Sequence, residues 1–298
     1  MSTVAPRVVV VSRPSELESL VARHGTRAQA SFFLERRGQS LRDVEERHLR
    51  IRATLEQVMR AIPLSWRRSH VTRADLPRWV FEPGDVVVAV GQDGLVPNVA
   101  KYLDGQTVIG VNPDPATFDG VLVRHRADRV GAAMRDAVAG TLKVEERTMA
   151  EASLDDGQRL LALNEVFVGQ RTHQSARYRV RAETREERHS SSGVVVATGT
   201  GATGWARSIC LQRKSPVPLP APSDRTLAFL VREAFPSVAT GVTLTEGIVA
   251  EGAALEVVSE MNEGGVVFAD GIEDDRIELG WGMRATVRVA RERLHLAA

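Results

Sequence analysis

The sequence predicts an N-terminal doubly wound α/β domain followed by a C-terminal β-rich domain. Three short runs of β-branched residues in the first 120 positions alternate with helix-like segments, as in a parallel sheet covered by helices. After about residue 146 the apolar runs become short and alternate with polar residues, which is typical of antiparallel strands. A length of 298 residues suits one large domain or two ordinary ones, and the change of pattern favours two. We therefore expect one domain over residues 1–145 and a second over residues 146–298.

The first elements of the α/β domain are predicted as a strand and two helices. The valine run 7–11 is typical of a buried parallel strand, and residues 16–24 follow it with a helical pattern. Ser40 and Asp43 have the spacing of a capping box. Apolar residues then recur every three or four positions until Pro63, which predicts a long amphipathic helix that ends before this proline.

The second and third strands of the domain are each followed by residues that suit a ligand site. The run 85–90 is followed by the turn 91–94 and a helical pattern, and the run 107–111 is followed by Asn112-Pro-Asp114. Ligands of doubly wound sheets bind at the carboxyl ends of the strands. We therefore expect both segments at a binding site.

The turn Gly91-Gln92-Asp93-Gly94 is the first candidate for chemistry. Backbone N–H groups at such a turn can receive phosphate. The carboxylate of Asp93 would engage a hydroxyl group that attacks that phosphate. The alternative is an ordinary β-turn, in which Asp and Gly only reverse the chain.

The second half of the chain is predicted to be mostly β-structure after a helix near residues 129–141. Prolines at every second position from Pro216 to Pro222 predict an extended loop. The expected strands are residues 158–168, 176–182, 193–197, 255–259, 265–269 and 285–290.

Asn164 and Glu165 form the second candidate site. They lie within the otherwise apolar run 158–168, and burial of either polar group without a partner would cost a few kcal/mol. A ligand or a polar partner is therefore expected there. The alternative is a polar pair at a strand edge.

Residues Gly199 to Gly204 fit the pattern G-x-G-x-x-G of dinucleotide-binding folds. A Rossmann fold is disfavoured, because the following helix can run only to about Leu211 and no second strand with a terminal acid follows. We interpret the glycines as positions where the backbone approaches a ligand or another strand.

Composition and charge limit the class of protein. The single cysteine, Cys210, cannot form an internal disulfide, and no apolar run approaches the roughly 18 residues of a membrane span, so we expect a cytoplasmic protein. The net charge of +1 divides into +7 over residues 1–80 and −6 over the rest. A nucleic-acid partner is one explanation of the basic part. We favour an arginine-rich composition, since 36 of the 39 basic residues are arginine.

Five short motifs follow one another between residues 85 and 290. They resemble, in this order, the NAD kinase (ATP-NAD kinase) family, and in particular its mitochondrial-type branch, which carries A-L-N-E-V-F and S-S-G followed by T-G-T-G. The segment 33–37 with the long helix behind it is also similar to that branch. The motifs are Gly91-Gln-Asp93-Gly94, Val108 to Asn112, Ala162 to Val166, Ser191 to Thr203, and Asp270-Gly271.

The resemblance implies an activity and a fold. The activity is transfer of the γ-phosphoryl group of ATP, with Mg²⁺ on the phosphates, to the 2′-hydroxyl of the adenosine ribose of NAD, which gives NADP. The implied fold is an α/β domain and a β-sandwich-like domain with the site in the cleft between them, the last residues packing back on the first domain. Small-molecule substrates and a homodimer are expected, with no nucleic acid and no membrane.

The resemblance also assigns roles to individual residues. Asp93 matches the acid that engages the attacking hydroxyl, with Gly91 and Gly94 beside it in the nucleotide-binding loop. Asn164 and Glu165 match the pair that hydrogen-bonds a ribose of NAD. The stretch that lines the cofactor pockets is matched by Thr198, Thr200, Gly201, Thr203, Trp205 and Ser208.

The chain departs from the family at one position of the turn and at the residue that follows the turn. Gln92 stands where the family has a second glycine, and Leu95 stands where it has threonine. Gln92 therefore bears on how ATP is placed. Three alternatives stay open: a catalytically impaired nucleotide-binding protein, a superfamily kinase that acts on a lipid or another hydroxyl, and polyphosphate in place of ATP. The preference for NAD or NADH also stays open.

Overall fold

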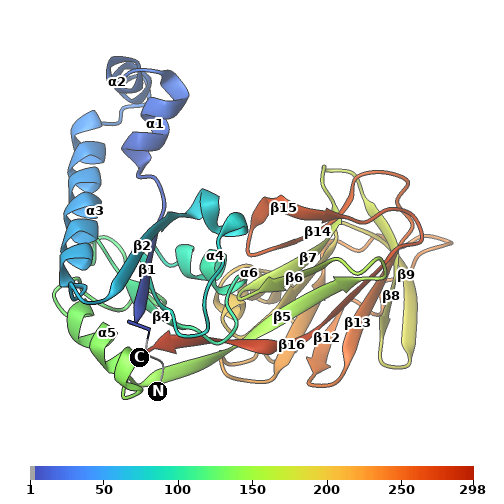
Figure 1. The fold of residues 1–298 in the computed structure, drawn as a ribbon. Helices are drawn as coiled ribbons and strands as arrows, with labels where there is room; N and C mark the ends of the chain where they lie inside the picture. The colour runs from blue at the N-terminus through green and yellow to red at the C-terminus, as the bar shows by residue number, and fades with distance from the viewer. Residues whose placement is uncertain (1–3) are drawn as a thin grey trace. The chain divides into compact units, whose positions relative to one another are not determined.

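The structure is a computed structural model that describes residues 4–298. The chain divides into two compact units (Figure 1). The first contains the residues up to Glu145 together with His295–Ala298, and the second contains Glu146–Leu294.

The first unit is built on a parallel sheet in the order β2-β1-β3-β4. The valines of the central strands are buried on both faces, as expected when helices cover a sheet. At the far side of β4, His295 and Leu296 of β16 (Arg284–Ala297) pair in parallel with Thr107 and Val108. The strands are β1 (Arg7–Ser12), β2 (Arg67–Thr72), β3 (Val86–Val90) and β4 (Thr107–Val111).

Helices α3 (Leu41–Ala61) and α5 (Val130–Ala139) pack on one face of this sheet, where Val58 and Met134 join the strand valines in one core. The short elements α4 (Leu95–Ala100) and η1 (Arg73–Arg78) contact each other and adjoin strands β3 and β2.

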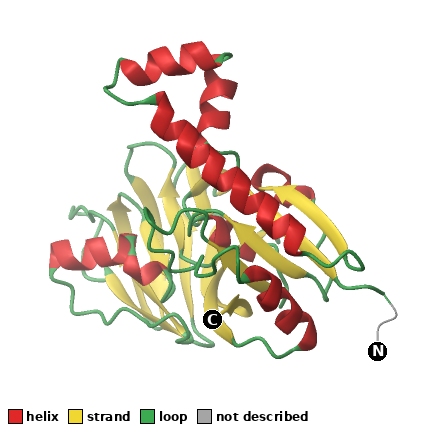
Figure 2. Ribbon diagram, turned by 90° about the vertical axis from the view of Figure 1, so that its left-hand side faces the viewer, coloured by secondary structure: helices red, strands yellow, loops and turns green. Residues whose placement is uncertain are grey.

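Helices α1 (Glu16–His24) and α2 (Arg27–Glu35) pack with the start of α3 around a separate small core. Figure 2 shows the long helix α3 rising from the sheet to these two short helices. The prediction of α1 is confirmed, whereas α2 was not predicted. The predicted capping box at Ser40 and Asp43 is wrong: Ser40 accepts only from the N–H of Arg42, and the capping box is formed by Ser15 and Glu18.

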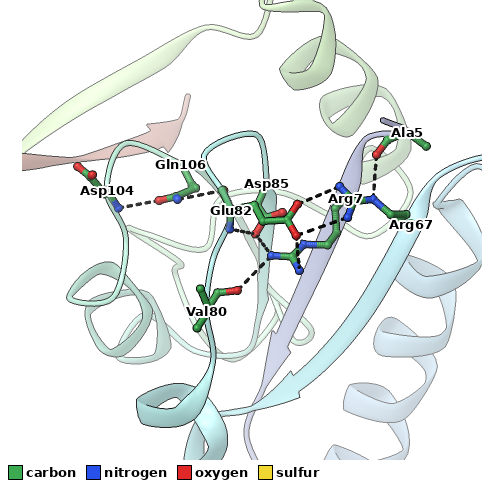
Figure 3. Close-up of polar contacts among 8 residues, drawn as sticks. All are labelled: Ala5, Arg7, Arg67, Val80, Glu82, Asp85, Asp104 and Gln106. Atoms are coloured by element: carbon green, nitrogen blue, oxygen red, sulfur yellow. Dashed lines mark hydrogen bonds and ion pairs between the residues drawn. The ribbon is translucent and has the colours of Figure 1, made fainter. Parts of the chain in front are cut away.

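An ion pair ties together the amino ends of β1 and β3 (Figure 3). Arg7 donates through Nε and Nη2 to the two oxygens of Asp85, at 2.6 Å each. The Asp85 carboxylate, whose side chain is 0% exposed, also accepts from the N–H of Glu82. Arg7 reaches the carbonyl of Val80 as well, and its hydrogen bond to Asp85 raises its pKa. Every charge in this buried network therefore has its partner.

The second unit is a β-sandwich, with a core of side chains from both sheets. One sheet contains β5 (Val144–Leu154), β6 (Arg159–Ala162), β8 (Ala176–Ala182), β9 (Arg185–Ser191), β13 (Ala254–Ser259) and most of β16. The other contains β7 (Glu165–Gln170), β10 (Val194–Ala197), β11 (Thr226–Val231), β12 (Glu246–Ala250), β14 (Gly265–Ala269) and β15 (Ile272–Glu278). Between β10 and β11 lie η2 (Gly201–Thr203) and α6 (Trp205–Arg213).

The run 158–168 is not one strand, as the sequence predicted. It is divided between β6 and β7, with a bend at Leu163 and Asn164. Glu165 therefore begins a strand. The bend forms because distant residues bind its backbone groups, which the local sequence cannot indicate.

Over residues 4–298, no helix combines the length and the apolar character needed to cross a membrane.

Candidate functional sites of the two units

A cavity of about 740 Å³ opens at the carboxyl ends of the parallel strands of the first unit. Residues that follow three of these strands line it: Arg13 after β1, Arg73 after β2, and Gly91 with Gln92 after β3. Its volume falls in the range of small-molecule sites. The turn 91–94 thus lies at the carboxyl ends of the strands, where Gly91 and Gln92 line the cavity and Asp93 and Gly94 do not. Its role in ligand binding stays a prediction.

Asp93 anchors a loop of its own unit. Its Oδ2 accepts from the N–H of Val121 at 2.9 Å, and its Oδ1 accepts from Leu122 at 2.7 Å and Val123 at 3.0 Å. A carboxylate has about four acceptor positions, so three are already used. Asp93 is thus held in one orientation and keeps one lone-pair position for a further donor.

The loop that Asp93 holds is packed tightly against β4. A Cβ atom at Gly110 would lie 2.2 Å from the carbonyl oxygen of Leu122, so only glycine allows this approach. Asn112 closes the same loop, because its side-chain amide donates to the carbonyl of Phe118 at 2.8 Å and its Oδ1 accepts from Asp114. The turn after β3 and the loop after β4 are therefore one connected structure.

The two glycines of the turn differ. The N–H of Gly91 donates to Val111 at 3.1 Å, and a Cβ there would press on Leu95 at 3.1 Å. Gly94 has an ordinary helical φ of −62° and open space where a side chain would lie. The N–H groups of Leu95 and Val96 bind carbonyls within the turn, so they are not available to phosphate in this conformation.

In the second unit, the bend before β7 brings Asn164 and Glu165 next to Asp270. The carboxylate of Asp270 accepts from the N–H of Leu163 at 3.1 Å and of Asn164 at 2.6 Å. Asp270 itself has a φ of +55°, an uncommon value for a residue other than glycine. Burial, and then the charge of Asp270, raise the pKa of Glu165 to about 7. The pair forms an acidic site in which Glu165 titrates near neutrality.

The glycine-rich segment after β10 closes over this bend. The hydroxyl of Thr198 donates to the carbonyl of Leu163 and accepts from the N–H groups of Thr200 and Gly201. A Cβ at Gly201 would lie 2.1 Å from the carbonyl oxygen of Asn164. The glycine therefore permits close approach of two chain segments, as the sequence indicated. The Thr198 hydroxyl therefore connects the glycine-rich segment to the bend at Leu163 and Asn164 through backbone groups of both.

The motif Gly199 to Gly204 is not a Rossmann fingerprint. Its strand, β10, pairs antiparallel with both β7 and β11, whereas a dinucleotide fold requires a parallel β-α-β unit. The structure thus agrees with the interpretation that disfavoured this fold.

The remaining predicted residues line the start of α6. The ring of Trp205 stacks on Phe167 at 5.7 Å and carries the guanidinium of Arg232 at 5.0 Å from its centroid, so it is already engaged in aromatic and cation–π contacts. Thr203 donates to the carbonyl of Thr200 at 3.2 Å, and Ser208 is exposed.

Some residues at these sites were not predicted. Arg147, which is 3% exposed, donates to Thr200 Oγ1 at 3.3 Å. Asp270 was recognised only as part of a motif, and Arg13 and Arg73 were not selected. For the last two, the signal was available, because each directly follows a strand of the parallel sheet. Among residues 4–298, no group of three or more His, Cys, Asp or Glu side chains could hold a metal ion.

Comparison with known proteins places this chain beside NAD kinases. No protein-family model matches the sequence. Over 130 residues the chain is 30% identical to a curated protein named NAD kinase from Chlorobaculum tepidum. This match covers 42% of the chain and 44% of that relative, so the chain spans less than half of the length of the relative it matches.

Two solved structures share the fold over nearly the whole chain. One is an NAD kinase from Archaeoglobus fulgidus in complex with ATP, with a TM-score of 0.60 and 18% identity, covering 98% of this chain and 93% of that one. The other is yeast NADH kinase complexed with NADH, with a TM-score of 0.60 and 16% identity, covering 100% and 84%.

The chain therefore shares its fold with an NAD kinase and with an NADH kinase, and the predicted fold class is confirmed. The resemblance to NAD kinases is confirmed in the same comparisons. The assignment to the mitochondrial-type branch stays a prediction.

Proposed function

We propose that this protein is an NAD kinase, which transfers the γ-phosphoryl group of ATP to the 2′-hydroxyl of the adenosine ribose of NAD(H) and forms NADP(H). The observation that supports it most is that the chain carries both a candidate site for the phosphoryl donor and a candidate site for the ribose of the acceptor. The first unit carries a cavity lined by Arg13, Arg73 and the first half of the turn that contains Asp93, and the second carries the acidic pair Glu165 and Asp270. The sequence similarity to a protein named NAD kinase and the structural similarity to a solved NAD kinase support the same function.

In the first unit, the role of Asp93 in this reaction is to receive the attacking hydroxyl. Its three backbone donors fix the carboxylate, and the remaining lone-pair position would accept a hydrogen bond from the ribose 2′-hydroxyl. Such an acceptor orients the hydroxyl and takes its proton as the new P–O bond forms. Mg²⁺ would be carried on the ATP phosphates, where it neutralises the developing charge.

In the second unit, the role of Asn164 and Glu165 is to hold a ribose. An ionised Glu165 accepts from ribose hydroxyls, and the Asn164 amide can both donate and accept. The backbone of this bend is fixed by Asp270 and Thr198 before any ligand binds, so the ribose site is preorganised.

The direct test is incubation with NAD or NADH, Mg²⁺, and either ATP or inorganic polyphosphate, followed by detection of NADP(H) with an NADP-specific dehydrogenase. Formation of NADP(H) is the expected result. NAD binding without NADP(H) from either donor would instead support an impaired nucleotide-binding protein, the alternative that Gln92 in the turn favours. Homodimer formation and a cytoplasmic location stay predictions, to be tested by sedimentation and by fractionation.

Substitution of Asp93 by Asn tests the assignment of this residue. We expect turnover to fall by roughly 10²- to 10⁴-fold, the usual scale for loss of a general base. NAD affinity should change little, because the side-chain oxygen of Asn can still accept a hydrogen bond from the hydroxyl although it cannot take its proton. Loop order is the control: hydrogen exchange at the amides of residues 121–123 reports whether the variant still holds the loop. Full turnover in Asp93→Asn would overturn the assignment.

A further inference from the structure

We propose that Arg13 and Arg73 form a clamp for the phosphate chain of the phosphoryl donor, which is either ATP or inorganic polyphosphate, and that Gln92 positions Arg13 within it. This inference rests on the proposed function and names the part of the cavity that would receive the donor.

The strand register brings the two arginines together. Ser12 and Thr72 are partners across the parallel pair of β1 and β2, so the residues that directly follow them leave adjacent strands at the same level. Ser12 is also the partner of Val90 in β3, which places Gly91 and Gln92 on the other side of Arg13. Three neighbouring strands therefore deliver two guanidinium groups and one amide to the same cavity.

The acidic residues of the cavity do not neutralise these arginines. Glu16 pairs with Arg47 at 2.8 Å, and Asp114 pairs with Arg50 at 3.0 Å. Over the part of the chain that the structure describes, no carboxylate lies within ion-pair distance of Arg13 or Arg73. The cavity thus has an uncompensated positive charge that an anion would balance.

The contacts of the two arginines are with neutral groups. Arg13 donates through Nη2 to Oε1 of Gln92, and Arg73 has a long contact of 3.4 Å to Oδ1 of Asn98. A side-chain oxygen on Gln92 therefore orients Arg13 and leaves its charge intact. A glycine at position 92, the residue of the family pattern, has no side chain that could do so.

Electrostatics agree with this arrangement. Arg13 is exposed to solvent, yet partial desolvation and then the positive charge of Arg73 lower its pKa. Two guanidinium groups that repel each other are stabilised by a multivalent anion between them, and each presents a planar fork that fits phosphate oxygens. A chain of phosphate groups matches this chemistry better than a single carboxylate does.

The test is isothermal titration of the full chain with ATP and, separately, with inorganic tripolyphosphate. The variants are Arg13→Gln, Arg73→Gln and the double variant, and the matched control is Arg135→Gln, an exposed arginine of α5 that does not line the cavity. We expect each cavity variant to weaken binding by about 10- to 100-fold, the scale of losing charge-assisted hydrogen bonds. NAD affinity and the melting temperature should stay unchanged, as in the control.

The two probes separate the possible donors. Equal losses for both would indicate that the clamp recognises the phosphate chain alone, whereas binding of tripolyphosphate but not of ATP would assign polyphosphate as the ligand. Unchanged affinity of the double variant for both probes would overturn the inference. Failure of the proposed function is distinguishable, because it would abolish NADP(H) formation while binding of the probes still depended on Arg13 and Arg73.

Discussion

The two ends of strand β1 each carry an arginine, and the two arginines have opposite surroundings. Arg7, at the amino end, is bound by both oxygens of Asp85 and lies near Glu82 at 3.2 Å (Figure 3). Arg13, just beyond the carboxyl end, has the amide oxygen of Gln92 as its one hydrogen-bond partner among residues 4–298. The same residue type on one strand is thus neutralised at one edge of the sheet and left charged at the other.

The difference separates residues that maintain the fold from residues that bind. A buried charge is tolerated while its partner of opposite charge is present. Removal of the partner destabilises the folded state, because a charge that has lost its hydration is then left unpaired. An uncompensated charge at a ligand-binding edge contributes little to stability and can interact with a substrate. Glu165 of the second unit is the acidic counterpart, because burial and the negative charge of Asp270 raise its pKa to about 7.

The largest effect is expected at the amino edge. Asp85→Ala should destabilise the protein by about 3–5 kcal/mol, because the largely buried Arg7 loses its bidentate partner and the N–H of Glu82 loses its acceptor. Urea unfolding measures this change. Arg13→Gln is the matched control at the other end of β1, and its unfolding free energy should stay within about 0.5 kcal/mol of the parent protein. Similar losses in both variants would show that the two edges do not differ.

An intermediate effect is expected at Glu165. Its folded-state pKa of about 7 exceeds the ordinary value of 4.5, so the folded state binds the proton more tightly between these values. Stability from this group is therefore greatest at low pH and falls as the pH rises from about 4.5 to 7. Glu165→Gln should remove this dependence and stabilise the protein at pH 8 by roughly 1–3 kcal/mol.

Urea unfolding at pH 5 and pH 8 tests the Glu165 prediction. Glu273→Gln, at an exposed position of β15, is the control and should leave the pH dependence unchanged. An equal stability difference between Glu165→Gln and the parent protein at both pH values would contradict the raised pKa.

The smallest effect on stability is expected from a substitution that gives Arg13 a carboxylate partner, as Arg7 has at the other end of β1. Gln92→Glu places a carboxylate against Arg13 and should increase stability by at most about 1 kcal/mol, since the pair is solvent-accessible. The same change should weaken binding of tripolyphosphate, because the charge of Arg13 is now balanced from within. Gln92→Gly serves as the comparison, as it removes the contact without adding charge. Undiminished tripolyphosphate binding by Gln92→Glu would argue against the clamp.

The sequence predicted most elements whose signal is local. The β-branched runs at β1, β3 and β4 and the capped segment 16–24 were located within about one residue. Strand β2 was missed because its residues are mostly polar and only Val71 is buried. Its membership in the sheet depends on pairing with β1, which no local pattern reports.

The sequence predicted which residues belong to the candidate sites but not which groups they contact. Asp93 and the pair Asn164 and Glu165 were selected from their motifs. Their partners lie far along the chain: Leu122 binds Asp93, and Asp270 binds the bend at Asn164. Hydrogen bonds between such distant segments follow from the tertiary fold, so they could not be read from spacing.

The return of the chain to β4 affects the order in which the protein can assemble during synthesis. His295 and Leu296 pair with β4 and complete the first sheet. Nδ1 of His295 lies 3.0 Å from the carbonyl oxygen of Gly105, and the N–H of Ala298 donates to the carbonyl of Lys143. All residues of the second unit leave the ribosome before these do. Until then, the outer edge of β4 lacks its partner, and an unpaired strand edge can associate with other chains. The edge of β4 is therefore open to such association throughout the synthesis of the second unit.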